Sequence, residues 1–200
     1  MSAPRAARAI VVGGGPAGAA SAWARAAQGH DVLVLDRARF PRDKACAEYL
    51  SPQASRILDA MGVLADVEGA GAAHLAGMTV RAPNGGTIHG EFAARHGFRG
   101  FRDRGLALRR RRLDPILLDG ARRAGAEVRD GVAVTDVLRD AAGAACGVVV
   151  REEGGATREL RADLVIGADG LRSVVGRRLG VAGRLPWPFP RRVAFVAHWR

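Results

Sequence analysis

The hydrophobic residues at the start of this chain occur in short, unbroken runs. Residues 9–12 form an apolar run long enough for a buried parallel strand, and residues 32–35 form a second one. Between the two runs, residues 19–28 are rich in alanine and contain no proline, which predicts a helix. The pattern therefore predicts strand, helix and strand in the order of one βαβ unit.

Further helices and strands are predicted along the middle of the chain. Ser51 and Pro52 are typical of a helix start, and the apolar residues after them recur at helical spacing until Gly62. Apolar positions on one face predict an amphipathic helix over residues 113–124. Strands are predicted at residues 106–109, 126–128, 131–138, 146–151 and 157–160, of which the last three form a β-meander.

The segment from residue 69 to residue 105 has a different pattern. Residues 78–81 and 87–90 flank Pro83-Asn84-Gly85-Gly86, which predicts a β-hairpin that stands away from the βαβ fold. After residue 183 several prolines break regular structure, and residues 192–199 predict a strand. We therefore expect one domain from residues 1–68 and 106–182, and part of an antiparallel β lobe from residues 69–105 and 183–200.

The composition is that of a globular protein with an excess of arginine. Hydrophobic residues make up 48% of the 200 residues and charged residues 26%, which are ordinary proportions. The formal net charge is +11, but Lys44 is the only lysine among 31 basic residues, and the arginines are scattered over the predicted helices. Aromatic residues, at 5%, are too few for a base-stacking surface, so we expect no nucleic-acid partner.

Cysteine content and hydropathy favour a cytoplasmic location. Cys46 and Cys146 are too few for a disulfide framework. The first predicted strand begins within ten residues of the start, which leaves no room for a signal peptide, and no apolar run reaches the length of a transmembrane helix. Peripheral membrane contact and the oligomeric state stay open.

His74, His89 and His96 lack metal-ligand spacing, so no metal site is predicted.

Three glycines and one acid give the first βαβ unit a candidate chemistry. Gly13, Gly15 and Gly18 follow the first strand with G-x-G-x-x-G spacing, and Asp36 ends the second strand. In this motif the first glycine allows a tight turn, the second admits a pyrophosphate to the backbone, and the third lets helix and strand pack closely. The N–H groups of the next helical turn face the phosphates, and the acid binds the ribose of an ADP moiety.

This motif predicts a dinucleotide without separating FAD from NAD, because both contain ADP. The charge of Asp36 would repel a 2′-phosphate, which argues against NADP as the ligand held here. The alternative is a glycine-rich turn in another kind of α/β protein, with Asp36 as a solvated strand end.

Two later segments add charged residues to the same region. Residues 37–50 predict a loop with several cations beside the nucleotide fold; an exposed connector is the alternative. The segment Gly167-Ala168-Asp169-Gly170 ends a predicted parallel strand, where ligands bind in open α/β sheets. The alternative for Asp169 is the N-cap of the following helix.

Three motifs in this order carry a resemblance to a known family. They are the glycine motif with Asp36, the segment Phe40-Pro41-Arg42-Asp43-Lys44-Ala45-Cys46, and Gly167-Ala168-Asp169-Gly170-x-x-Ser173. The chain resembles the FAD-dependent oxidoreductases of the aromatic-hydroxylase superfamily, in particular the branch with geranylgeranyl reductases and tailoring monooxygenases. The resemblance implies an α/β fold: a Rossmann-like FAD-binding domain with a parallel sheet and a β-meander crossover, plus part of an antiparallel β substrate lobe.

The resemblance also implies which residues hold the adenosine and pyrophosphate parts of FAD. Gly13, Gly15 and Gly18 cradle the pyrophosphate, with Ala17 beside them. Asp36 holds the ribose and Arg37 lies on the adenine side. The backbone around Ala133 meets the adenine.

Other residues correspond to the flavin end of the cofactor. Arg42, Lys44 and Cys46 would lie near the isoalloxazine and ribityl group, and Arg110 would approach the ribityl or phosphate region. Asp169 and Gly170 match a second motif, which supports the pyrophosphate and, in the hydroxylases, the use of a nicotinamide cofactor.

The chain departs from the family pattern in two places. Ala47 stands where the family often has a glycine after the cysteine. The family's third flavin motif, a Gly-Asp-Ala segment followed by proline, is absent from these 200 residues. We therefore expect the chain to correspond to the N-terminal portion of the family plan.

From this resemblance we expect an FAD-dependent enzyme, and three functional alternatives stay open. The first is a monooxygenase that hydroxylates an aromatic or polyketide-like small molecule with O₂ and NADH or NADPH. The second is an alkene reductase similar to geranylgeranyl reductase, and the third is a non-catalytic flavin-domain fragment. No side chain is predicted to be catalytic, because the flavin carries the chemistry.

Overall fold

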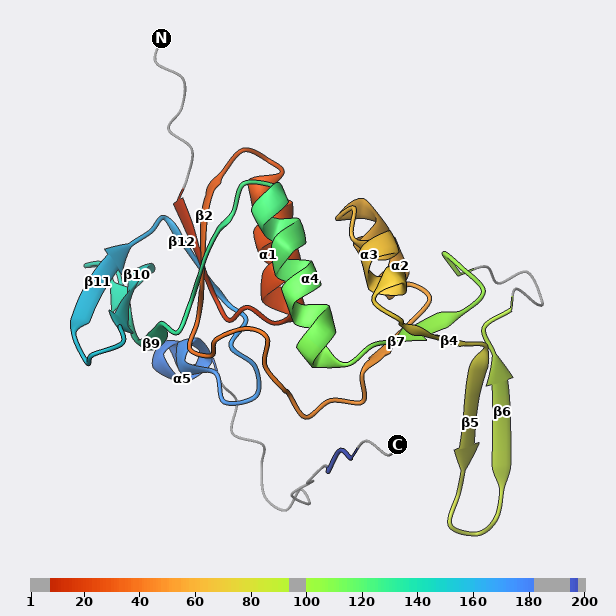
Figure 1. Ribbon diagram of the computed structural model, residues 1–200. Helices are drawn as coiled ribbons and strands as arrows, with labels where there is room; N and C mark the ends of the chain where they lie inside the picture. Colours follow the sequence, from red (N-terminus) through yellow and green to blue (C-terminus); the bar gives the residue numbers. More distant parts are fainter. Residues whose placement is uncertain (1–7, 94–99, 182–194, 198–200) are drawn as a thin grey trace.

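The centre of the molecule is a four-stranded sheet in which all neighbouring strands are parallel (Figure 1). The computed structural model describes residues 8–93, 100–181 and 195–197. The strand order is β12-β1-β2-β8, with β1 (Arg8–Val12), β2 (Asp31–Asp36), β8 (Glu127–Asp130) and β12 (Leu164–Gly167). The predicted α/β fold with a parallel sheet is thereby confirmed.

Side chains from β1 and β2 alternate between two buried layers. Val11 and Val34 pack toward α1 (Pro16–Ala26) and α4 (Arg110–Arg123), which lie side by side over one face of the sheet (Figure 1). Ile10 and Leu33 point to the opposite layer. Because both faces are covered, these strands are continuous apolar runs rather than alternating ones.

The opposite face of the sheet is covered by the predicted β-meander. Its strands are β9 (Ala133–Arg139), β10 (Ala145–Arg151) and β11 (Thr157–Arg161), paired in the antiparallel order β11-β10-β9. Val148 and Val150 of β10 are fully buried against the sheet, together with Val175 of α5 (Val174–Leu179). The meander thus forms the second wall of the core.

A second group of elements extends from one end of α4 (Figure 1). It contains α2 (Ala54–Ala60), α3 (Leu64–Gly69) and an antiparallel sheet of order β3-β7-β4, whose strands are Tyr49–Leu50, Gly105–Ala107 and Ala73–Leu75. The hairpin of β5 (Gly77–Arg81) and β6 (Thr87–Glu91) projects from this group. Met78, Val80 and Ile88 of the hairpin are exposed.

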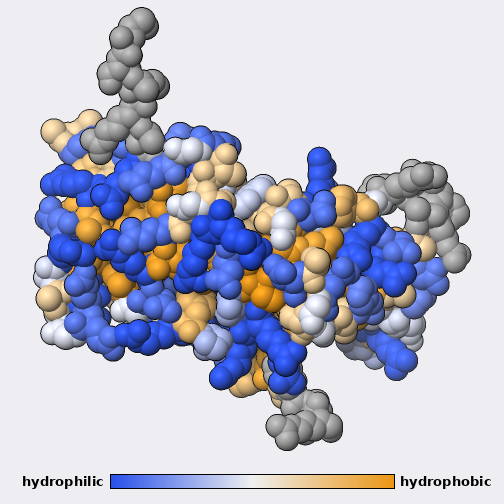
Figure 2. All heavy atoms as spheres, turned by 45° about the horizontal axis from the view of Figure 1, so that its top comes forward, coloured by the Kyte–Doolittle hydropathy of each residue, from blue (hydrophilic) through white to orange (hydrophobic). Residues whose placement is uncertain are grey.

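Hydrophilic side chains cover most of the face seen in Figure 2, and hydrophobic residues show between them in patches. The described residues contain no helix with both the length and the apolar character needed to cross a lipid bilayer.

Several element boundaries differ from the predicted ones. Helix α1 begins at Pro16, because proline has a φ suited to the first helical position and needs no N–H acceptor there. Helix α4 begins at Arg110, three residues before its apolar stripe. Helix α2 begins only at Ala54, and the Ser51 hydroxyl accepts a hydrogen bond from the Ala54 N–H at 3.2 Å in the turn before it.

The short elements α3, β3 and β4 were not predicted, because two to six residues are too few to show a period. The strand predicted for residues 192–199 lies mostly outside the described residues, and residues 195–197, which are described, are not in a strand. The division into two domains stays a prediction.

The turn between β1 and α1 depends on contact between backbones. A Cβ added to Gly18 would lie 1.8 Å from the carbonyl oxygen of Gly13, and a Cβ on Gly13 would lie 2.4 Å from the carbonyl oxygen of Ala168. Neither backbone atom can move aside as a flexible side chain can. Helix α1 can therefore pack this closely only while these positions are glycine.

We expect Gly18→Ala to destabilise the fold by about 3 kcal/mol, because the new methyl group overlaps a backbone oxygen. That loss corresponds to a fall in Tm of roughly 6–12 °C for a domain of this size, measured by circular dichroism. The matched control is Gly69→Ala at the end of α3, where an added Cβ has no neighbour within 4 Å. An equal fall in Tm in both variants would contradict the packing argument.

Candidate cofactor site

The site begins at the turn that joins β1 to α1. Gly13 has a positive φ of 105° and donates its N–H to the Leu35 carbonyl at 2.7 Å, so the turn is tied to the end of β2. Gly15 is the N-cap of α1 and has extended backbone angles. The first N–H groups of α1 therefore open toward the carboxyl edge of the sheet, where an anion can bind.

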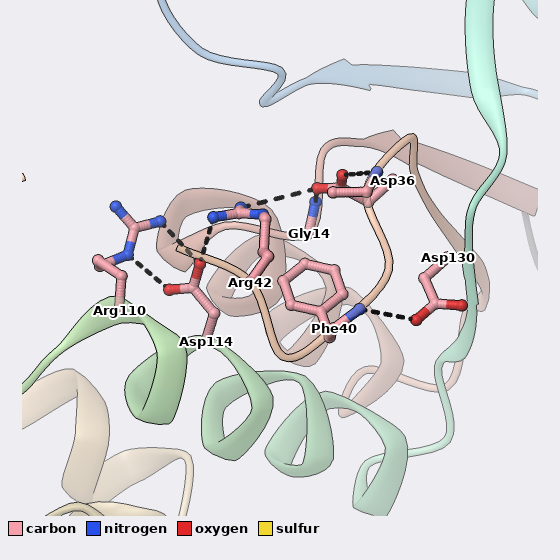
Figure 3. A network of polar contacts seen from close by, with 8 residues as sticks. Gly14, Asp36, Phe40, Arg42, Arg110, Asp114 and Asp130 are labelled. Carbon is pink, nitrogen blue, oxygen red and sulfur yellow. Dashed lines mark hydrogen bonds and ion pairs between the residues drawn. The ribbon is translucent and has the colours of Figure 1, made fainter. Parts of the chain in front are cut away.

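Asp36 at the end of β2 orients the turn from the other side. One oxygen of its buried carboxylate accepts the Gly14 N–H at 2.7 Å, and the other accepts the Ala38 N–H at 2.8 Å (Figure 3). Each carboxylate oxygen can accept a further bond. The carboxylate is thus held in place by backbone donors and keeps acceptor capacity for ribose hydroxyls.

The loop after Asp36 is held close to this turn by contacts with β8 and α4. The Phe40 N–H donates to Asp130 of β8 at 3.1 Å, and the Arg42 guanidinium lies over the Phe40 ring, 4.9 Å from its centroid (Figure 3). Arg42 also forms an ion pair with Asp114 of α4 at 3.0 Å. The cationic loop predicted from the sequence is therefore folded back onto the nucleotide fold.

Asp114 is the central anion of this charge cluster. Its carboxylate is fully buried and accepts two hydrogen bonds from Arg110, at 2.6 Å to Nε and 2.9 Å to Nη2. Burial by itself would lower the pKa of Arg110, but the hydrogen bonds and negative charge of Asp114 outweigh it and raise that pKa further. Arg110 therefore keeps its positive charge beside the glycine turn.

A cavity of about 730 Å³ lies over these residues, within the range of roughly 300–1,000 Å³ that is usual for ligand sites. It brings together most residues predicted to bind a cofactor: Gly13, Gly15, Ala17, Asp36, Arg37, Arg42, Lys44, Arg110, Ala133, Asp169 and Gly170. Two predicted residues, Gly18 and Cys46, do not line it. Gly18 packs against the Gly13 backbone, whereas the half-buried Cys46 contacts Arg110.

Asp169 lies at the cavity and also at the start of α5. It accepts a hydrogen bond from the Ser173 hydroxyl at 2.6 Å and another from the Val174 N–H. Ser173 is the N-cap residue, and its hydroxyl accepts the Gly176 N–H at 2.8 Å. The alternative of Asp169 as the N-cap is therefore wrong, because Ser173 occupies that position. Asp169 lines the cavity and also accepts hydrogen bonds from the first residues of α5.

Sequence reasoning missed several polar residues of the site. Arg151 of β10, Thr135 of β9 and Arg172 after Asp169 line the cavity, but nothing in their local sequence marks them. Asp114 was detectable in principle, because Arg110 and Asp114 have the i,i+4 spacing of a helical ion pair.

The cavity fits a dinucleotide in three respects. Gly15 leaves a space at the turn that a side chain would fill toward Arg42 and Arg110. Arg42 Nη1 is buried and has no hydrogen-bond acceptor within the described part of the chain. The lining carries Arg37, Arg42, Lys44, Arg110, Arg151 and Arg172 against three aspartates, so the net charge suits a pyrophosphate.

The fold and this cavity define a dinucleotide-binding domain of the Rossmann type. Comparison with known families then identifies its cofactor class: the FAD binding domain family matches residues 6–186, and the chain belongs to that family. The predicted FAD cofactor and the resemblance stated above are thereby confirmed. Bound FAD supplies two-electron redox chemistry, and the residues above would hold its pyrophosphate and ribose.

The chain is similar to two curated reductases. It is 37% identical over 177 residues to digeranylgeranylglycerophospholipid reductase 1 of Methanopyrus kandleri, which covers 88% of this chain and 43% of that protein. It is 36% identical over 177 residues to menaquinone reductase of Mycolicibacterium smegmatis, covering 86% and 39% respectively. The chain thus spans less than half of either relative's length.

Solved flavoenzymes share the fold. The myxobacterial chondrochloren halogenase CndH, an FAD-dependent halogenase, superposes with a TM-score of 0.76 and 31% identity over 88% of this chain and 40% of its own. PqsL of Pseudomonas aeruginosa, described as a "probable FAD-dependent monooxygenase", has a TM-score of 0.71 and 26% identity over 93% and 48%. Proteins similar to this domain thus include reductases, a halogenase and a probable monooxygenase.

We expect Gly15→Ala to separate cofactor binding from folding. The added methyl group would meet only the flexible ends of Arg110 and Arg42, at 3.3 and 3.8 Å, so stability should change by less than about 1 kcal/mol. The same methyl would occupy the approach of the pyrophosphate and weaken FAD binding at least about tenfold. Fluorescence titration with FAD and a thermal melt measure the two effects, and an unchanged affinity for FAD would contradict the assignment.

We expect Asp36→Asn to weaken FAD binding by about 10- to 100-fold, because the variant loses a charged acceptor for the ribose and the Gly14 N–H. The matched control is Asp31→Asn at the opposite end of β2, where the aspartate is exposed and pairs with Arg8 at 3.7 Å. Equal losses of FAD affinity in both variants would show a general effect on β2 rather than loss of a ribose contact.

Proposed function

We propose that this chain is the FAD-binding part of an oxidoreductase that reduces carbon–carbon double bonds of an isoprenoid substrate. The observation that carries the proposal is the 36–37% identity to two curated reductases, one acting on a digeranylgeranyl lipid and one named for menaquinone. Both names point to substrates with isoprenoid chains. The reaction would add two hydrogen atoms across an alkene, with electrons supplied by NADH or NADPH.

In this proposal the chain binds and orients the cofactor. The glycine turn with Arg42 and Arg110 would receive the pyrophosphate, and Asp36 would hold the ribose. The Val132 N–H, just before β9, donates a hydrogen bond to the Asp36 carbonyl at 2.9 Å and ties this segment to β2. The start of β9 would lie along the adenine. Lys44 lines the cavity and would lie toward the flavin end of the cofactor. The substrate would be a small molecule, and we propose a cytoplasmic location for the enzyme.

A second candidate is an oxygen-using enzyme, as first expected from the sequence. It is favoured by the similarity in fold to PqsL and to the halogenase CndH, at 26% and 31% identity. In that case an aromatic or polyketide-like substrate would gain an oxygen atom from O₂. The third candidate, a non-catalytic fragment, predicts that the chain folds incompletely, binds little FAD and shows no turnover.

The first test is whether the purified chain keeps FAD through desalting and whether NADH or NADPH then reduces it without oxygen. We expect retention of the flavin absorbance bands and their bleaching by one of the two nicotinamides. The reduced protein is next incubated with geranylgeraniol under nitrogen, and the product is analysed by mass spectrometry.

A gain of two hydrogen atoms per reduced double bond supports the alkene reductase. A gain of one oxygen from an aromatic substrate, only in air, would replace it with the monooxygenase. A chain that loses FAD on desalting would favour the non-catalytic fragment. A chain that retains FAD but is bleached by neither nicotinamide would contradict reduction of the flavin by NADH or NADPH within this part of the enzyme.

A further inference from the structure

One buried carboxylate holds both arginines that face the glycine turn. Asp114 has no exposed side-chain surface, accepts two hydrogen bonds from Arg110, and forms an ion pair with Arg42 at 3.0 Å (Figure 3). Arg110 comes from the same helix, whereas Arg42 comes from the loop after β2. Asp114 therefore joins two cations that are far apart in the sequence.

The two guanidinium groups lie close to Gly15, the position at which this motif admits a pyrophosphate to the backbone. Nη2 of Arg110 is 3.3 Å, and Nη2 of Arg42 is 3.8 Å, from the position that a Cβ of Gly15 would occupy. Both arginines and Gly15 line the cavity, but Asp114 does not. Asp114 would therefore not itself contact a ligand in the cavity.

The contacts leave donors available on the arginines. A guanidinium has five N–H groups, and Asp114 accepts two of those of Arg110. Its contact with Arg42 is a charge contact, since Arg42 Nη1 has no acceptor in hydrogen-bond geometry within the described residues. Arg42 also forms an ion pair with Asp36 at 3.9 Å, so the two arginines face two carboxylates. The cavity lining as a whole still carries more cations than aspartates, and an anionic ligand can neutralise that excess.

We propose that Asp114 is a positioning residue that holds Arg42 and Arg110 beside Gly15 before the ligand binds, and so preorganises the binding site for the pyrophosphate. The inference rests on the FAD-binding role of the chain and adds a residue that does not touch the cofactor. Prior orientation raises affinity, because the entropy of ordering two long side chains is lost on folding rather than on binding.

The competing explanation is that Asp114 only ties the loop to α4. A matched control exists for that explanation, because Asp130 also anchors the loop, through the Phe40 N–H at 3.1 Å, but has no contact with Arg42 or Arg110 (Figure 3). Asp114→Asn and Asp130→Asn both replace a carboxylate by an amide of the same size. Only the first removes a direct contact with the arginines, whereas the second acts on the loop through Phe40.

The experiment compares the binding of ADP and adenosine by the full 200-residue chain, using isothermal titration calorimetry. We expect Asp114→Asn to weaken ADP about 10- to 100-fold and adenosine less than about threefold, since adenosine has no pyrophosphate. Asp130→Asn should change both affinities by the same factor. Equal losses for ADP and adenosine in Asp114→Asn, or no loss for ADP, would overturn the proposal.

A double-mutant cycle covers the case in which Asp114→Asn alone does not fold. In a chain with Arg42→Gln and Arg110→Gln, Asp114 has lost both partners, so Asp114→Asn should not weaken ADP binding further. A further tenfold loss in that background would show that Asp114 acts independently of the arginines and would overturn the proposal.

The proposed function fails separately. Reduction by neither nicotinamide, with ADP binding intact, would count against the proposed flavin reduction in this chain, while the comparison of ADP with adenosine would still decide the role of Asp114. If the wild-type chain does not bind ADP, the proposal that Asp114 preorganises a pyrophosphate site is overturned.

Discussion

The contact between the Gly18 position and the Gly13 carbonyl oxygen is the constraint on which this structure depends. It sets how closely α1 can approach β1, and Gly13 in turn lies against the backbone of Ala168 at the end of β12. Three segments that are distant in the sequence therefore meet with no side chain between them. Their close approach leaves the first N–H groups of α1 at the carboxyl edge of the sheet, which is where an anion is best stabilised.

Carboxylates organise the remainder of the site around that turn. Asp36 accepts two backbone N–H groups, Asp130 accepts one from the loop, and Asp114 gathers two guanidinium groups. Burying a carboxylate is unfavourable unless its oxygens are paired, so each fixes its partners in place. Asp36 and Asp130 thereby fix the backbone of the turn and the loop, and Asp114 fixes the two arginines. A site for an anionic cofactor can therefore depend on carboxylates.

Much of this fold was predictable because its periodicity is strong. The apolar runs of β1 and β2, the helical stripe of α4 and the three meander strands each have the length that a pattern requires. The short elements α3, β3 and β4 do not, and the start of α4 was missed because Arg110 to Arg112 carry no apolar signal. Most predicted cofactor residues line the cavity, whereas Gly18 packs against the Gly13 backbone and Cys46 contacts Arg110.

The sequence by itself determined the class of the domain, because the glycine spacing, the acid after the second strand and the order of the elements are local properties of the chain. It also named FAD through a resemblance that the family comparison confirmed. Only the tertiary structure decided which charges act together. Arg42 and Asp114 are brought into contact by the fold, and Arg151 and Thr135 reach the cavity because the meander covers the sheet. Such contacts depend on how elements pack, which no local spacing encodes.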